Sequence, residues 1–257
     1  MALLHGTYTS PTLGHTVDFQ ALLPDPASGA SGSARHPTLW LLHGMFGGYS
    51  DWCRYSLVER YAAQYGLAVV MASAENSYYA DMVCGDRYFT FFTEELPQVM
   101  RGFFPLSDRP EDNCIAGLSM GGYGAMKIGL TYPERFRAVC SFSGALDIAT
   151  LCSRQIVVQA DLVRRIFGED GPAGTGADLF QLLRGHAAAG TRLPALYSWC
   201  GTQDMLLGDN DRFAALCREL SIPLFYRTQP GGHEWDFWND ALRQFLAAVY
   251  GEKAEGK

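Results

Sequence analysis

The chain has 257 residues, of which 48% are hydrophobic and 18% are charged, and its formal net charge at pH 7 is −7. This composition can build a sizeable core and carries too few charges for a disordered chain. The negative net charge argues against general electrostatic binding to nucleic acid or to an anionic membrane, and no apolar run is long enough for a transmembrane helix.

The N-terminus and the cysteines bear on the compartment of the protein. The first residues lack the basic region and the full apolar region of a signal peptide. The seven cysteines are scattered and include no Cys-x-x-Cys pair, which is typical of reduced thiols. We therefore expect a cytoplasmic protein, and nothing in the sequence resembles a zinc site.

The N-terminal part predicts the edge of a sheet followed by its buried centre. Period-two stretches at Thr7–Ser10 and His15–Leu23 predict an antiparallel hairpin. A glycine- and serine-rich connection from Pro24 to Pro37 leads to Thr38–Leu42, a continuous apolar run typical of a strand buried on both faces. A helix is expected over Ser50–Gln64, before the next buried strand at Leu67–Ala72.

The next segment alternates a long loop with regular elements. Glu75–Tyr88 is polar and irregular, and a long loop at the carboxyl end of a strand is expected to form a wall of a pocket. Phe89–Phe104 has its apolar residues on one face and predicts a helix. The short apolar run Asp112–Ala116 predicts a strand, and Gly122–Leu130 predicts a helix that stops before Pro133.

The turn between this strand and helix carries the sequence Gly117-Leu118-Ser119-Met120-Gly121. Strand, Gly-x-Ser-x-Gly and helix together are the pattern of a nucleophile elbow, in which the chain turns so sharply that the serine is exposed. Gly117 and Gly121 are expected to be required because a side chain at either position would collide across the turn. The motif alone is weak, so its context decides, and Ser119 is our candidate nucleophile.

The later part of the chain continues the alternation of strands and helices. We expect strands at Arg137–Phe142, Leu196–Cys200 and Leu224–Thr228, with helices at 211–220 and from about 235 to 250. The intervening segment, about 145–190, has a residue pattern typical of helices but is interrupted by glycines. It is too short to bury a core of its own. We therefore expect one domain over residues 1–257, with this segment as a small helical cap.

A serine hydroxyl becomes a nucleophile when a base accepts its proton. Two histidines follow Ser119, and His233 lies in a glycine-flanked loop straight after the last strand, whereas His186 lies in the insertion. His233 is therefore the candidate base, in the chain order serine, acid, histidine. Asp204 directly follows the preceding strand and is the candidate acid.

Other residues remain open for these roles. Asp209 and Asp211 are rivals for the acid, although they fit better in the first turn of the next helix, and Asp147 is more distant in the chain. His43 precedes Gly44 and is interpreted as organising its loop rather than as a second base.

Several motifs together resemble the esterase D-like family of α/β-hydrolases, and within it the small bacterial tributyrin esterases. They are His43-Gly44-Met45-Phe46-Gly47, Asp51-Trp52, Glu94-Glu95-Leu96-Pro97 and the elbow through Gly124. The resemblance runs from about Leu39 to Phe245. It implies an α/β-hydrolase fold with a mostly parallel, doubly wound sheet.

The resemblance also completes the expected site. It implies an oxyanion hole made by the backbone N–H groups of Met45 and Met120, such as stabilises a tetrahedral intermediate. It requires no organic cofactor and no metal. Relatives often assemble, so a homo-oligomer is left open, and a small-molecule ester is the expected partner.

The expected function is that of a serine carboxylesterase that hydrolyses short-chain acyl esters through an acyl-enzyme. Candidate pocket residues are Phe46, Trp52, Tyr79 and Trp235, whose bulk is expected to shorten the acyl site. Tyr78, Phe237 and Trp238 are further bulky residues in or beside these loops. Trp235, Phe237 and Trp238 have the alternative of packing the final helix against the sheet. Alternatives are a thioesterase resembling S-formylglutathione hydrolase, whose relatives usually carry a different loop at His43–Gly47, and a feruloyl-type esterase.

Overall fold

The computed structural model describes residues 1–25, 35–154 and 160–252. Eight strands within these ranges form one sheet in the order β1-β2-β4-β3-β5-β6-β7-β8. The strands are β1 (Ala2–Thr9), β2 (Thr16–Leu23), β3 (Thr38–Leu42), β4 (Ala68–Ala72), β5 (Asn113–Leu118), β6 (Ala138–Phe142), β7 (Ala195–Gly201) and β8 (Leu224–Gln229). β1 and β2 form the predicted antiparallel hairpin, β2 is antiparallel to β4, and the remaining pairs are parallel.

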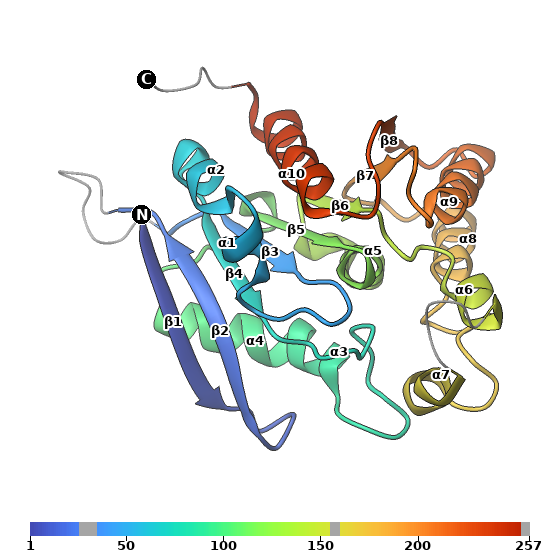
Figure 1. Ribbon diagram of the computed structural model, residues 1–257, viewed down its shortest axis with the longest axis horizontal. Helices are drawn as coiled ribbons and strands as arrows, with labels where there is room; N and C mark the ends of the chain where they lie inside the picture. The colour runs from blue at the N-terminus through green and yellow to red at the C-terminus, as the bar shows by residue number, and fades with distance from the viewer. Residues whose placement is uncertain (26–34, 155–159, 253–257) are drawn as a thin grey trace.

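Helices cover both faces of this sheet (Figure 1). They are α1 (Asp51–Tyr55), α2 (Val58–Tyr65), α3 (Tyr88–Thr90), the π-helical turn η1 (Phe91–Glu95), α4 (Leu96–Phe103), α5 (Met120–Thr131), α6 (Ile148–Arg154), α7 (Ala160–Phe167), α8 (Leu179–Ala189), α9 (Leu207–Glu219) and α10 (Trp235–Tyr250). Two short 3-10 turns, η2 (Pro110–Asp112) and η3 (Pro133–Arg135), precede β5 and β6.

The buried strands supply a separate core on each side of the sheet. In β3, Leu39 and Leu41 pack with the side chains of α1, α2 and α10, whereas Trp40 and Leu42 pack with those of α4, α5, α8 and α9. Successive side chains of a strand point to opposite faces, so a continuous apolar run fills both cores. The sheet is thereby held between two helical layers, and its carboxyl edge is left for loops.

Two helices replace the single helix expected over Ser50–Gln64. The break lies at Ser56, whose backbone is extended and whose Oγ donates to the Trp52 carbonyl while accepting the N–H of Val58. The N–H of Leu57 donates to Asn239 Oδ1 in α10. These side chains satisfy backbone groups at the helix ends, which makes the break favourable without a proline or glycine.

The loop at 75–88 is more buried than its polar sequence predicted. Tyr78 and Tyr79 are 1% and 0% exposed, and both have a positive φ, at 52° and 50°. The loop is therefore packed into the core at these two residues. Its outer part pairs with α7, because the N–H groups of Val83 and Cys84 donate to carbonyls of Ile166 and Arg165.

The insertion at 145–190 divides into parts with different roles. α8 buries Leu179 and Leu183 in the core and packs against α5 and α9, so it belongs to the helical layer. α6 and α7 lie at one side of the sheet (Figure 1). Residues 155–159 of the expected cap, most of the Pro24–Pro37 connection and the end of the tail lie outside the described residues.

Within residues 1–25, 35–154 and 160–252, no helix combines the length and the apolar character that crossing a membrane requires.

Candidate active site

Ser119 stands in a strained turn between β5 and α5. Its φ is 54° and its ψ is −117°, and its N–H donates to the Phe142 carbonyl at 2.9 Å. A Cβ atom at Gly117 would lie 2.4 Å from the Gly121 carbonyl oxygen, and one at Gly121 would lie 2.5 Å from that of His43. Only glycine fits these two positions. Gly117 faces Gly121 across the turn, as predicted, whereas Gly121 faces the end of β3 rather than the turn, and together they permit the sharp bend that presents the serine.

A chain of hydrogen bonds connects three residues from separate parts of the sequence. His233 Nε2 lies 3.0 Å from Ser119 Oγ, and His233 Nδ1 lies 3.0 Å and 3.1 Å from the two carboxylate oxygens of Asp204. A carboxylate only accepts hydrogen bonds, so Nδ1 carries the proton and Nε2 is left to accept the serine proton. The three candidates thus stand in the arrangement that activates a serine hydroxyl.

The Asp204 side chain is fully buried, whereas that of His233 is 21% exposed. Burial alone would raise the pKa of Asp204, but the hydrogen bond from His233, the charge of that ring and the N–H of Leu206 hold it below its ordinary value. The carboxylate is therefore ionised at neutral pH, as a partner for a developing imidazolium must be.

The other candidate acids are occupied elsewhere. Asp147 and Asp209 both pair with the guanidinium of Arg212. Asp211 accepts the hydroxyl proton of Tyr226 at 2.7 Å. Among the aspartates weighed from the sequence, Asp204 alone is hydrogen-bonded to His233 in the described ranges.

The other two histidines of interest are bonded to the main chain. His186 Nε2 lies 2.7 Å from the Leu130 carbonyl oxygen. His43 is 1% exposed, its Nδ1 lies 2.7 Å from the Gly44 carbonyl oxygen, and its Nε2 accepts the N–H of Ala74 at 2.8 Å. Burial lowers the pKa of His43, although the hydrogen bond to Gly44 acts in the opposite direction. A neutral His43 therefore holds its loop in place.

Further contacts fix the loop at His43–Gly48 beside Ser119. The Tyr79 hydroxyl donates to the His43 carbonyl at 2.9 Å, and an Asp51 carboxylate oxygen accepts the N–H of Gly48 at 3.0 Å. A Cβ atom at Gly47 would lie 2.2 Å from that carboxylate oxygen. The loop geometry thus depends on glycine and on a buried tyrosine that the sequence did not single out for this purpose.

Met45 and Met120 are the residues whose N–H groups were predicted to bind an oxyanion. Met120 is the first residue of α5, directly after Ser119, and Met45 lines the same cavity as Ser119. Within the described residues, neither N–H donates a hydrogen bond to another protein group. Their role as oxyanion donors stays a prediction.

A cavity of about 670 Å³ opens over Ser119 and His233. Of the four predicted pocket residues, Phe46 and Trp235 line it, and Phe46 is 85% exposed at its mouth. Trp52 does not line it, because Trp52 is buried beneath Trp235, with ring centroids 5.2 Å apart, and its Nε1–H donates to the Leu42 carbonyl. The expectation for Trp52 was therefore wrong.

Tyr79 does not line the cavity either, since its side chain is directed to the His43 loop; its neighbour Tyr78 does. The Tyr78 hydroxyl approaches Met45 Sδ at 3.2 Å. Tyr78 was among the bulky residues expected around Ser119, whereas sequence reasoning missed Leu151 of the insertion and Met205, which line the cavity. Met205 directly follows Asp204, so its position beside the acid was the available signal.

The walls of this cavity are largely apolar and aromatic. Trp238 packs edge-on against the His233 ring, with centroids 4.9 Å apart, and stands in turn against Trp235. These contacts restrict the ring of His233 to the orientation that faces Ser119. In the described part of the chain, no group of three or more His, Cys, Asp or Glu side chains is arranged to hold a metal ion.

Comparison with known proteins gives consistent matches. The family model described as "Putative esterase" matches residues 10–249. The chain is 34% identical over 209 residues to an acetyl esterase of Caldicellulosiruptor saccharolyticus. The aligned region covers 79% of each protein.

Two solved structures from Staphylococcus aureus are also similar. The fluorophosphonate-binding serine hydrolase FphF superposes with a TM-score of 0.91 at 30% identity, over 98% of this chain and 99% of the other. An S-formylglutathione hydrolase superposes with a TM-score of 0.88 at 30% identity, over 97% of this chain and 98% of the other. These likenesses confirm the predicted α/β-hydrolase fold, and the chain belongs to the "Putative esterase" family as a carboxylic ester hydrolase.

Proposed function

We propose that the protein is a serine carboxylesterase that cleaves short-chain acyl esters, with Ser119 as nucleophile, His233 as base and Asp204 as the acid that orients it. The observation that carries the proposal is the hydrogen-bond chain from Ser119 Oγ through the His233 ring to the buried Asp204 carboxylate. The acetyl esterase relative supports the substrate class.

The proposed reaction proceeds in two acyl-transfer steps. Ser119 Oγ attacks the ester carbonyl while His233 Nε2 takes its proton, and the N–H groups of Met45 and Met120 bind the developing oxyanion. His233 then gives the proton to the departing alcohol, which leaves an ester between the acyl group and Ser119. Water, deprotonated by His233, hydrolyses this acyl-enzyme and restores the serine.

The short-chain preference rests on the walls of the Ser119 cavity. Tyr78, Leu151 and Leu206 are buried side chains that line it, and they limit the space beside the serine. Each methylene that enters an apolar pocket contributes roughly 0.8 kcal/mol, and the gain stops when the chain meets the wall. We expect kcat/KM to rise from acetate to about butyrate and to fall beyond about hexanoate.

A panel of p-nitrophenyl esters from acetate to decanoate, with one feruloyl ester, tests the preference. The Ser119→Ala protein is the control for contaminating esterases, and its activity should fall below about 1% of wild type. Leu151→Ala should shift the optimum toward longer chains by enlarging the cavity. A kcat/KM that rises steadily through decanoate in the wild type would contradict the proposal.

A thioesterase acting on S-formylglutathione is the second candidate function. It is favoured by the similarity to the S-formylglutathione hydrolase structure, and the same serine, histidine and acid would serve it. Parallel measurement of kcat/KM for p-nitrophenyl acetate and S-formylglutathione separates the two. A thioester rate more than about a hundredfold higher would reassign the substrate class while retaining Ser119.

A further inference from the structure

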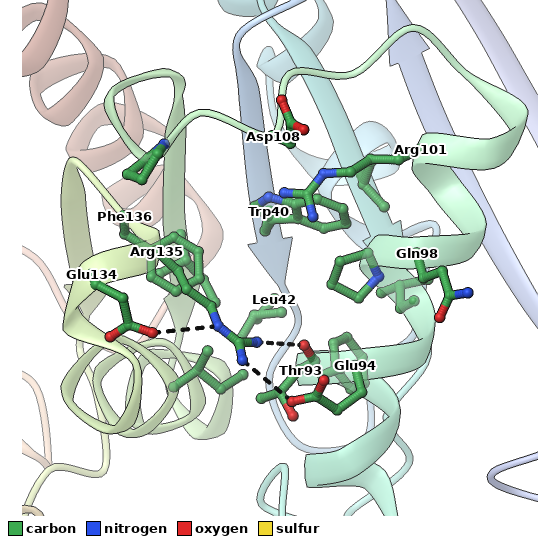
Figure 2. Close-up of a pocket in the computed structure, with 17 residues that line it drawn as sticks. Trp40, Leu42, Thr93, Glu94, Gln98, Arg101, Asp108, Glu134, Arg135 and Phe136 are labelled. Atoms are coloured by element: carbon green, nitrogen blue, oxygen red, sulfur yellow. Dashed lines mark hydrogen bonds and ion pairs between the residues drawn. The ribbon is translucent and has the colours of Figure 1, made fainter.

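A second cavity of about 660 Å³ lies on the other side of the sheet from α10, between α4 and α5 (Figure 2). Its floor is formed by strands β3, β4 and β5, and its walls by η1, α4 and η3. Among the described residues, none lines both this cavity and the one at Ser119. We call it the Arg101 cavity.

The Arg101 cavity has the size and the lining of a small-molecule site. Trp40, Leu42 and Ile115 of the sheet floor are buried and apolar, and Phe92 and Leu96 add apolar walls. Binding pockets for small molecules have volumes of roughly 300–1,000 Å³, mostly apolar walls and a few polar groups that fix the ligand. The remaining requirement is a polar group with an unused bonding capacity.

Arg101 supplies that group. Its guanidinium lies over the Trp40 ring, 5.7 Å from the centroid, and Nη2 makes one long contact of 3.5 Å to Asn113 Oδ1. Its Nε atom is buried and has no hydrogen-bond partner. Within the described ranges no carboxylate lies close enough to Arg101 for a direct ion pair. Burial lowers the pKa of Arg101, and the charge of the exposed Asp108 carboxylate, seen above it in Figure 2, opposes this effect. A buried guanidinium donor without an acceptor is costly.

Arg135 lines the same cavity but is saturated by protein groups. Its guanidinium donates to the Thr93 carbonyl at 2.8 Å and pairs with Glu94 at 3.4 Å and Glu134 at 3.7 Å, as Figure 2 shows. Its positive charge is therefore compensated within the protein. Arg101 is therefore the arginine of this cavity that, among the described residues, has no direct ion pair.

We propose that the Arg101 cavity binds an amphipathic carboxylate, with the guanidinium of Arg101 holding the carboxylate and the apolar floor holding a ring or short alkyl body. A planar guanidinium donates two parallel hydrogen bonds to a carboxylate. The ligand carboxylate would accept hydrogen bonds from the two Nη groups, of which Nη2 makes only the long contact to Asn113, and its apolar body would cover Trp40 and Ile115. The site is independent of the chemistry at Ser119.

Isothermal titration calorimetry with 2-naphthoate and its neutral analogue 2-naphthamide tests the proposal. The enzyme is first modified with a fluorophosphonate, so that the cavity at Ser119 is blocked. We expect one naphthoate site with a Kd on the order of 0.1 mM and naphthamide binding about tenfold weaker. Equal affinity for the two probes, loss of binding on modification, or no heat at millimolar naphthoate would each overturn the proposal.

Three variants locate the site. Arg101→Gln should weaken naphthoate about tenfold and abolish the difference between the two probes. Gln98→Glu places a carboxylate on an exposed position three residues before Arg101 on α4, and should weaken naphthoate by competing for the guanidinium without a risk to folding. Arg135→Gln is the matched control, since its guanidinium is already paired, and should change the Kd less than threefold. An equal loss with Arg135→Gln would contradict the assignment to Arg101.

Discussion

The loops that carry His43 and His233 both follow parallel strands of the same sheet, both contain glycines, and both reach the surroundings of Ser119. Their histidines differ in their partners. His43 is buried, and both of its ring nitrogens are hydrogen-bonded to main-chain groups of Gly44 and Ala74. His233 is partly exposed and stands between a carboxylate and a hydroxyl.

This difference shows what suits a histidine to proton transfer. A ring nitrogen that accepts a backbone N–H has no free lone pair for a proton from substrate or serine. A ring held at Nδ1 by a buried carboxylate keeps Nε2 as an acceptor and gains a partner for its charged form. The two loops therefore predict opposite effects on mutation, one on activity and the other on stability.

The largest effect is expected at His233. His233→Ala should lower kcat/KM for p-nitrophenyl butyrate by roughly 10⁴-fold or more, because the serine loses its base. The free energy of unfolding should change by less than about 1 kcal/mol, since the side chain is partly exposed. Steady-state kinetics and urea unfolding measure the two quantities. A Ser119→Ala, His233→Ala double variant much slower than either single variant would contradict the idea that the two groups act as one unit.

Asp204→Asn should be the next most damaging change. The amide would favour the wrong tautomer of His233, and we expect a loss of about a thousandfold or more in kcat/KM. Asp211→Asn is a matched control because Asp211 bonds to Tyr226 instead, and it should retain activity within a fewfold. If Asp209→Asn or Asp211→Asn were more damaging than Asp204→Asn, the assignment of the acid would be wrong.

His43→Gln should act mainly on stability. The glutamine amide has its donor and acceptor on one carbon and cannot reach both the Gly44 carbonyl and the Ala74 N–H as the ring does, so one of these buried groups loses its partner. We expect the free energy of unfolding to fall by about 2–3 kcal/mol. Loosening of the loop that carries Met45 should also lower kcat, by about tenfold. His15→Gln, at an exposed position, is the control and should lie within about 0.5 kcal/mol of wild type. A His43 variant with full stability and a loss as large as that of His233→Ala would reverse the roles of the two histidines.

The smallest expected effect is a pH dependence that belongs to His43. Its pKa is lowered in the folded protein, so below about pH 6.5 the unfolded chain takes up a proton that the native ring resists. Stability should therefore fall as pH decreases, by at most about 1.4 kcal/mol per pH unit from this group.

The comparison of wild type with His43→Gln isolates this contribution, because the other titrating groups cancel. Urea unfolding at pH 7.5 and pH 5.5 should show wild type losing about 1 kcal/mol more than the variant. The same pH dependence in both proteins would show that His43 is not held neutral by its surroundings.

The sequence was most informative where local sterics decide the structure. Gly117 is required by its contact with Gly121 across the turn, and Gly121 by its contact with the end of β3, so Ser119 could be predicted from the motif together with its flanking strand and helix. The ends of the strands that precede Asp204 and His233 could likewise be predicted from the residues next to them. Because parallel strands end at one edge of the sheet, these residues were expected to meet, as the structure places them.

The walls of the two cavities could not be read in the same way. Tyr78 and Tyr79 are neighbours with similar backbone angles, yet one lines the Ser119 cavity and the other supports the His43 loop. Which tyrosine does which depends on the path of a loop that has no regular period. The Arg101 cavity likewise depends on the distance between α4 and α5, which no pattern within either helix specifies.

The central claim is that Ser119 is the nucleophile, and covalent labelling tests it most directly. The protein is treated with a fluorophosphonate, and the intact mass and the modified peptide are measured by mass spectrometry. We predict a single adduct on Ser119, no adduct in Ser119→Ala, and labelling slowed by several orders of magnitude in His233→Ala. An adduct on another residue, or undiminished labelling of Ser119→Ala, would contradict the account.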